Sequence, residues 1–497
     1  MYGLGASYCS VVTGKLVIRF ADFVSKEKST NEVLLRIYKY ADYMDLISLE
    51  QVSRRCYETI RSMVWPQVGR IGWHNGVLFG QYRGMRYYKK LTESEEVGDP
   101  NKLIAILKRV GSHVVAFEFN FVKDTAQDLD YPGGHRERPK AQYEYSLPSM
   151  LSLLKPSYIV ELSLQGTPIQ AKELIFIAET FTQLEAVDFS NGSLSCAAED
   201  RQNMSESFSI FLEKFSSYGR LEELRMRFNF NLTYLNFELI PPSLKKLNLS
   251  GCKLKSQDLS HIGQRCHQLE DLMIDIHDEV TREDMVSLFD GMQSGHLRYL
   301  WLAHFYHFVF EMPSVDFSPA LRHSINSILG DWTTTPMILR NLKSGDYPVL
   351  TFINISNDTI KDEAIIPLAK LPRLKNLRLR CEEISDQAVI PIISNGILEN
   401  LSVWSRYITD QVPRLAIERC KRLKELEINR TTETPVPNAE EILEMVHHVM
   451  DTRYGPNERP TCKYDPRLLC FCINRDTFEC MNLHPWVVVH PPWDYYR

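Results

Sequence analysis

A spacing of 24 residues recurs in the second half of the chain and constrains its fold more than any other feature. Segments that begin at Ile360, Ile384 and Ile408 follow one another at this interval, and each carries an aspartate at its third position. A unit of this length cannot bury its apolar side alone, so several units must stack. We therefore expect one growing array of repeats, although 497 residues would ordinarily suggest about three domains.

One complete unit lies between Leu244 and Leu269. Its first half reads Leu-x-x-Leu-x-Leu-x-x-Cys and ends at Cys252, and its second half carries apolar residues at helical spacing up to Cys266. A strand followed by a returning helix with this signature is typical of a leucine-rich-repeat solenoid. The first residues of the expected strands are Ile159, Leu184, Leu221, Leu244, Leu269, Leu297, Leu350, Leu374, Leu398 and Leu423.

The fold class that follows is α/β, a curved parallel sheet with outer helices over residues 113–435. Insertions are expected near residues 120–157 and 305–345, and the second stretch holds either a degenerate repeat or a large insertion. A small domain of three short helices is expected ahead of the repeats. The remaining segments are an N-terminal arm at 1–28, the helical domain at 29–68, a connector at 69–112 with a helix at 102–110, and a capping helix and tail at 436–497.

The residues between the motif leucines should point to the concave face of the sheet. Large aromatic side chains exposed there would be typical of a binding hot spot. Arginines beside them suit an extended peptide that carries acidic or phosphorylated side chains. Two alternatives remain open. In the first, inserted loops or the tail cover the aromatic side chains. In the second, Glu223, Glu425 and Glu427 pair with the arginines. The candidate target-binding residues are Arg225, Arg227, Tyr299, Trp301, Arg378, Arg380 and Trp404.

The helical domain at 29–68 is too small for a substantial core of its own, so it should pack against a partner. Its sequence Val52-Ser53-Arg54-Arg55, followed by Trp65, resembles an F-box. The family opens with Leu-Pro, whereas Ser29-Thr30 stands here. Combined with the repeats, the block resembles the F-box/leucine-rich-repeat family of substrate receptors. A generic helical cap over the first repeat is the alternative.

The resemblance implies a non-enzymatic subunit of a cullin-based SCF-type ubiquitin ligase. Residues 29–68 would dock on a Skp-type adaptor beside the cullin scaffold, and the repeats would hold a protein target for ubiquitination. A leucine-rich-repeat scaffold that no longer engages the adaptor is the alternative, because the Leu-Pro opening is missing. The adaptor-binding residues that the resemblance implies are Val33, Leu34, Ile37, Leu46, Leu49 and Val52.

Composition narrows the remaining function classes. A net charge of -6 gives no general attraction to nucleic acid or to an anionic membrane. We expect no transmembrane helix and no secretory signal, and buried free thiols suit the reducing cytoplasm or nucleus. No cofactor or metal is expected, since the tail cysteines lack zinc-site spacing. A ligase with its own catalytic cysteine, Cys470, is a third reading.

Overall fold

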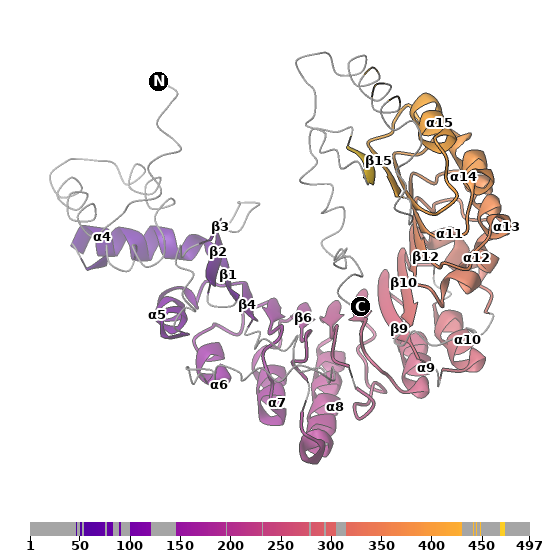
Figure 1. Cartoon of the computed structure of the whole chain (residues 1–497). Coiled ribbons are helices and arrows are strands. Elements are labelled where there is room, and N and C mark those ends of the chain that lie inside the picture. The colour runs from indigo at the N-terminus through magenta and orange to yellow at the C-terminus, as the bar shows by residue number, and fades with distance from the viewer. Residues whose placement is uncertain are drawn as a thin grey trace, which may run out of the picture. The chain divides into compact units, whose positions relative to one another are not determined.

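The computed structural model divides the chain into two compact units, unit 1 at Met1–Cys266 and unit 2 at His267–Arg497 (Figure 1). Most of the expected N-terminal arm, helical domain, capping helix and tail lies outside the residues that the structure describes. The described residues are 54–74, 77–82, 89–90, 100–120, 146–194, 196–230, 232–277, 280–292, 295–304, 315–429 and 468–472, with single positions 46, 50, 51, 441, 444 and 448.

Unit 1 alternates strands and helices. Its sheet has the order β3-β2-β1-β4-β5-β6-β7-β8, in which β1 pairs parallel with β4 and antiparallel with β2. The described elements are α4 (Arg54–Thr59), the π turn η1 (Ile60–Val64), η2 (Trp65–Gln67), β1 (Val68–His74), β2 (Val77–Tyr82), β3 (Lys89–Lys90), α5 (Pro100–Val110), β4 (Ala116–Asn120), α6 (Leu147–Leu151), β5 (Glu161–Ser163), α7 (Ala171–Thr180), β6 (Ala186–Asp188), η4 (Ala198–Asp200), α8 (Arg201–Tyr218), β7 (Glu223–Arg225), β8 (Lys246–Leu249) and α9 (Ser256–Arg265).

Unit 2 continues the same alternation. Strands β9 to β15 pair in parallel, and β16 closes the edge by pairing antiparallel with β15. Its elements are β9 (Asp271–Ile276), α10 (Arg282–Gly291), β10 (Tyr299–His304), α11 (Pro319–Ser324), β11 (Ser327–Gly330), α12 (Thr335–Leu342), β12 (Phe352–Ser356), α13 (Asp362–Ile365), η5 (Ile366–Lys370), β13 (Asn376–Arg380), α14 (Asp386–Ile393), β14 (Asn400–Trp404), α15 (Gln411–Arg419), β15 (Glu425–Asn429) and β16 (Leu468–Cys472).

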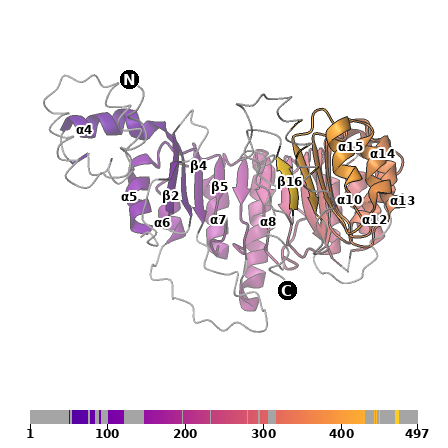
Figure 2. The ribbon, with the colours of Figure 1, turned by 45° about the horizontal axis from the view of Figure 1, so that its top comes forward.

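The motif leucines form the core between sheet and helices, as the sequence predicts. Leu247, Leu377 and Leu401 are at most 1% exposed. Within each unit the labelled repeat helices lie on one side of the strands (Figures 1 and 2). The thiols of Cys266 and Cys381 pack in this core, and burial raises the pKa of each to about 12, so both remain protonated. The α/β leucine-rich-repeat fold is therefore confirmed.

Two stretches depart from simple expectation. The 53 residues between the expected strand starts Leu297 and Leu350 contain a degenerate repeat. Its strand is β11, which pairs in parallel with both β10 and β12. The segment predicted as a connector at 69–112 also contributes to the sheet, since its strand β1 pairs with β4. Apolar residues at alternate positions explain this, because Ile71 and Trp73 are buried. The helix predicted at 102–110 is found in α5.

Two of the aspartates that recur every 24 residues, Asp362 and Asp386, each link their repeat to the next one. Asp362 accepts a hydrogen bond from the backbone N–H of Ser385 at 2.7 Å and another from its hydroxyl. Asp386 does the same for Thr409, at 2.8 Å from the backbone nitrogen. Ser385 and Thr409 immediately precede Asp386 and Asp410, so each carboxylate fixes the start of the following helical segment.

We expect Asp386→Ala to lower the free energy of unfolding by about 1–3 kcal/mol, because two donors of the next repeat lose a charged acceptor. Urea-induced unfolding would measure this loss. Glu383→Ala is the matched control, since Glu383 is an exposed carboxylate on the same segment. Equal stability of the two variants would contradict a linking role for Asp386.

Among the described residues, no helix is long and apolar enough to cross a membrane.

Candidate functional site

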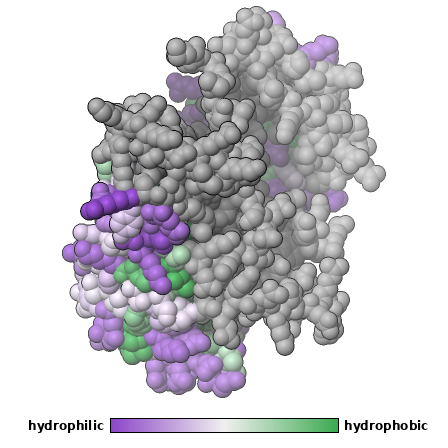
Figure 3. Space-filling model, turned by 90° about the vertical axis from the view of Figure 1, so that its left-hand side faces the viewer, coloured by the Kyte–Doolittle hydropathy of each residue, from purple (hydrophilic) through white to green (hydrophobic). Residues whose placement is uncertain are grey.

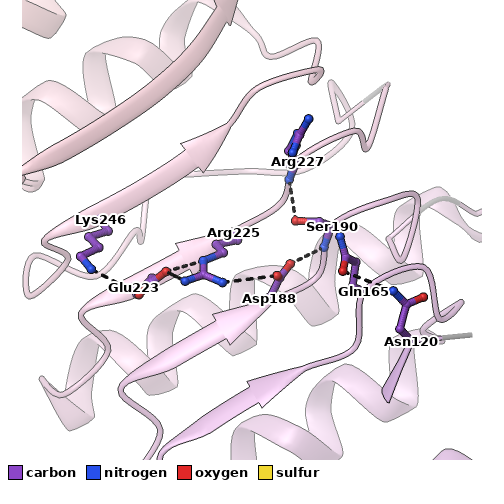
Figure 4. A network of polar contacts seen from close by, with 8 residues as sticks. All are labelled: Asn120, Gln165, Asp188, Ser190, Glu223, Arg225, Arg227 and Lys246. Carbon is purple, nitrogen blue, oxygen red and sulfur yellow. Dashed lines mark hydrogen bonds and ion pairs between the residues drawn. The ribbon is translucent and has the colours of Figure 1, made fainter. Parts of the chain in front are cut away.

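The sheet residues between the motif leucines form regular rows on the face opposite the helices. In unit 1 these rows are charged and internally paired (Figure 4). Arg225 contacts Glu223 on its own strand and lies 3.7 Å from Asp188 on the neighbouring strand. Lys246 lies 3.9 Å from Glu223. The predicted cation Arg225 is thus already held by two carboxylates.

Burial shifts the ionisation of this network. Desolvation raises the pKa of the Glu223 carboxyl above its ordinary value, and Arg225 and Lys246 only partly oppose that shift. Desolvation also lowers the pKa of the Arg225 guanidinium, against the attraction of Glu223 and Asp188. The ion pairs of Arg225 with Glu223 and Asp188 therefore lie on a partly dehydrated surface, where each charged group is stabilised by its charged neighbours.

Arg227 lies in the next row, toward the carboxyl end of the strands. Its guanidinium stacks 4.3 Å from the centre of the Phe228 ring, and its backbone N–H donates to the Ser190 hydroxyl at 3.1 Å. Phe228 has a positive φ of 55°, and its ring stacks 6.2 Å from the exposed Phe230 ring. Arg227 is therefore part of a cation–aromatic stack that the sequence had not indicated.

The equivalent face of unit 2 begins with an apolar cluster. Met273, Tyr299 and Leu329 are 3–5% exposed and lie on β9, β10 and β11, with Trp301 and Phe352 packed against them. The prediction that Tyr299 is exposed is therefore wrong. Large apolar side chains occupy the same face of four successive strands and pack against one another.

Polar residues replace the apolar cluster on β13 to β15. Arg378 lies 3.7 Å from Glu425, and the Arg380 guanidinium lies over the Trp404 ring at 5.2 Å from its centre. Burial raises the pKa of the Glu425 carboxyl, Arg378 lowers it, and nearby Glu427 raises it. The structure thus brings Arg378, Arg380 and Trp404 together on two adjacent strands, as their sequence spacing predicts.

Two exposed aromatics beyond the strand ends escaped the sequence prediction. Trp332 is 44% exposed and follows β11, and Tyr407 is 58% exposed and follows β14. Arg406, next to Tyr407, pairs with Glu382 after β13. Both lie outside the Leu-x-x-Leu-x-Leu motif, so strand alternation says nothing about them.

A buried carboxylate organises the N-terminal end of unit 1. Glu50 accepts a hydrogen bond from the Trp65 indole N–H at 2.6 Å and from Arg109 Nε at 2.8 Å, and Arg61 lies 3.6 Å away. The Glu50 side chain is 4% exposed. Because Arg109 is on α5, just before β4, the helical segment around α4 is tied directly to the first repeat.

The comparison with protein families matches residues 30–65 to the F-box domain. The match ends at Trp65, directly before the first strand of a sheet built from strand–helix repeats. The chain is an F-box/leucine-rich-repeat protein. No curated protein matched its sequence.

Solved structures similar to this F-box/leucine-rich-repeat protein are distant in sequence. They include an internalin from Listeria monocytogenes (15% identity, TM-score 0.36, covering 55% of this chain and 75% of the internalin). A chain of the yeast Rad7 and Elc1 complex is 17% identical, with a TM-score of 0.39 and coverage of 58% and 75%. A leucine-rich-repeat protein of Leptospira interrogans is 12% identical, with a TM-score of 0.31 and coverage of 67% and 88%.

Of the predicted adaptor-binding residues, only Leu46 lies within the described part of the F-box/leucine-rich-repeat protein, and it is fully buried. The side chains of Val33, Leu34, Ile37, Leu49 and Val52 lie outside it. The described residues on the exposed face of α4 are Arg54 and Glu58, with side-chain exposures of 92% and 61%, and Tyr57, which is 42% exposed. Seen from that end, the coloured surface is mostly hydrophilic and is interrupted by smaller hydrophobic patches (Figure 3).

Among the described residues, no group of three or more histidine, cysteine, aspartate or glutamate side chains has the geometry to hold a metal ion. The tail cysteines Cys462 and Cys480, and the side chains of Cys470 and Cys472, lie outside that part.

Proposed function

We propose that this protein is the substrate-recognition subunit of an SCF-type ubiquitin ligase. The F-box would dock on a Skp-type adaptor and through it on a cullin scaffold. The observation that supports this most is the F-box at residues 30–65 in a chain whose following residues form repeats with a broad sheet face. The protein itself would be non-catalytic and would act in the cytoplasm or nucleus.

The mechanism would be proximity. A target held on the repeats has its lysines at a high effective concentration near the charged ubiquitin-conjugating enzyme, which speeds transfer without any chemistry from this chain. The Glu50 contacts support such a role, because they join the F-box segment to the first repeat through buried ionic and hydrogen-bonded contacts. A target on the repeats would then keep a defined direction from the adaptor.

The target side is proposed to be the sheet face of each unit, with Arg227 in unit 1 and with Trp301, Arg378, Arg380 and Trp404 in unit 2. Arg225 contributes less in this proposal than its sequence suggested, because Glu223 and Asp188 already hold it. Tyr299 would pack beside Trp301 instead of meeting the target itself, because it is buried. The arginines alone would favour an acidic or phosphorylated target, but Arg225 and Arg378 already lie beside carboxylates of the same face, which argues against that chemistry.

We expect Val52→Asp to reduce co-purification of a Skp-type adaptor by about tenfold or more, because a carboxylate on an apolar contact must be dehydrated on binding. The assay is a pulldown of the full chain with the purified adaptor. Gln202→Asp is the control, since it adds the same charge at an exposed position of α8. A melting curve shows whether each variant stays folded. A folded Val52→Asp variant that co-purifies like the control would contradict the docking surface.

An alternative function is a leucine-rich-repeat scaffold that no longer engages the adaptor. Ser29-Thr30 in place of the family's Leu-Pro favours this alternative. The same pulldown separates the two, because the unmodified scaffold would not retain the adaptor at all. Restoring Leu-Pro by Ser29→Leu with Thr30→Pro would then be expected to create binding.

A further inference from the structure

One edge of unit 2 displays aromatic side chains to solvent. Tyr407 and Trp332 are 58% and 44% exposed and follow the carboxyl ends of β14 and β11. The carboxyl ends of parallel strands lie at one edge of a sheet, and three strand spacings separate these two loops by about 14 Å. The side chain of Asn357, after β12, donates to the Trp332 backbone carbonyl and ties that loop to the next repeat.

Trp404 extends this edge onto the sheet face. It is the last residue of β14, it is partly exposed, and the Arg380 guanidinium lies over its ring. A cation stacked on one face of the indole restricts its rotamers before any partner arrives. Binding then costs less side-chain entropy than at a mobile aromatic, which favours Trp404 as an anchor.

The charges at this edge compensate one another. Arg406 pairs with Glu382, whose neighbour across the repeat is Asp358. Burial raises the pKa of the Asp358 carboxyl, Glu382 raises it further, and Arg380 and Arg406 oppose the rise. Two guanidinium groups thus face two carboxylates. A phosphate, which carries a charge of about -1.5 to -2, would have to compete with Glu382 and approach Asp358.

From these observations we propose that the rim formed by Arg380, Trp404, Arg406 and Tyr407 binds an apolar, unphosphorylated segment of a protein partner. The inference rests on the proposed function, since it states what chemistry the target side of a substrate receptor recognises. An extended segment of about five residues spans the distance from Tyr407 to Trp332. Its apolar side chains would cover Trp404 and Tyr407, and the compensated charges would form the polar border.

The test is selection from a random 12-residue peptide library displayed on phage, with the full chain as bait. The rim should enrich peptides that carry aromatic or aliphatic residues. Their affinity, measured by fluorescence anisotropy with synthetic peptides, should change less than about twofold between 0.1 and 0.5 M NaCl, because little net charge is neutralised. Tyr407→Ala and Trp404→Ala should each weaken binding by about tenfold.

Tyr158→Ala is the matched control and should bind like the unmodified chain. Tyr158 is 45% exposed and also carries a cation over its ring, Lys155 at 4.1 Å, but it belongs to unit 1. The proposal is overturned if the enriched peptides are acidic and lose affinity in salt, if a phosphothreonine version binds better, or if no peptide distinguishes Tyr407→Ala from Tyr158→Ala. The adaptor takes no part in this assay, so loss of adaptor binding with intact peptide binding would overturn only the proposed function.

Discussion

Leu377→Ala is expected to lower the free energy of unfolding by about 2–5 kcal/mol, because it opens a cavity in the core that the surrounding repeats cannot fill. Leu377 is fully buried on β13, where its backbone pairs with Ile353 on one side and Leu401 on the other. The loss of stability would therefore extend to the neighbouring repeats that contain β12 and β14. Unfolding in urea gives the change, and hydrogen exchange of β12 to β14 shows its location.

Trp404→Ala is the comparison that makes this prediction specific. Trp404 lies on the adjacent strand but on the opposite face, where it is partly exposed beneath Arg380. Its removal leaves no closed cavity, so we expect a loss of less than about 1 kcal/mol. If Trp404→Ala destabilised the protein as much as Leu377→Ala, the two faces of the sheet would have been assigned the wrong way round.

The contrast between these two residues shows how far the sequence determines this fold. A strand alternates its side chains with a period of two, so the motif leucines and the face residues could be separated by position alone. The repeated strand–helix unit predicted the parallel strands, and the period of two placed Arg378, Arg380 and Trp404 together on one face. The aspartates at 24-residue intervals also marked the repeat, although their acceptor role toward Ser385 and Thr409 became visible only with the structure.

What alternation cannot predict is what covers a face. Tyr299 occupies a face position like that of Trp404, yet it is buried in a cluster with apolar residues of the neighbouring strands on that face. Trp332 and Tyr407 lie in loops, where no period assigns a direction to a side chain. The contact of Glu50 with Arg109 joins residues 59 positions apart in sequence, and no local pattern relates them.

Glu50→Ala is expected to have the second large effect, a loss of about 3–5 kcal/mol in the free energy of unfolding of unit 1. The carboxylate is 4% exposed, and Arg109 is 20% exposed, so neither side chain has free access to water. Without Glu50, the Arg109 guanidinium loses its carboxylate partner in a partly dehydrated site, and the Trp65 indole loses its carboxylate acceptor. Chemical unfolding of the full chain would measure the loss.

A double-mutant cycle identifies the contact that links the F-box segment to the first repeat. Arg109→Met keeps much of the apolar stem of the side chain while removing its charge, so Glu50→Ala should cost less in that background than in the unmodified chain. Glu50→Gln should fall between, because an amide oxygen still accepts from Trp65 but no longer attracts Arg109 as a charge. If the contact between Glu50 and Arg109 holds the F-box segment to α5, hydrogen exchange of α4 should rise in Glu50→Ala. It should change little in Glu213→Ala, since Glu213 is an exposed residue of α8. Additive losses in the cycle would mean that Glu50 and Arg109 stabilise unit 1 independently and that their contact does not hold the F-box segment to the first repeat.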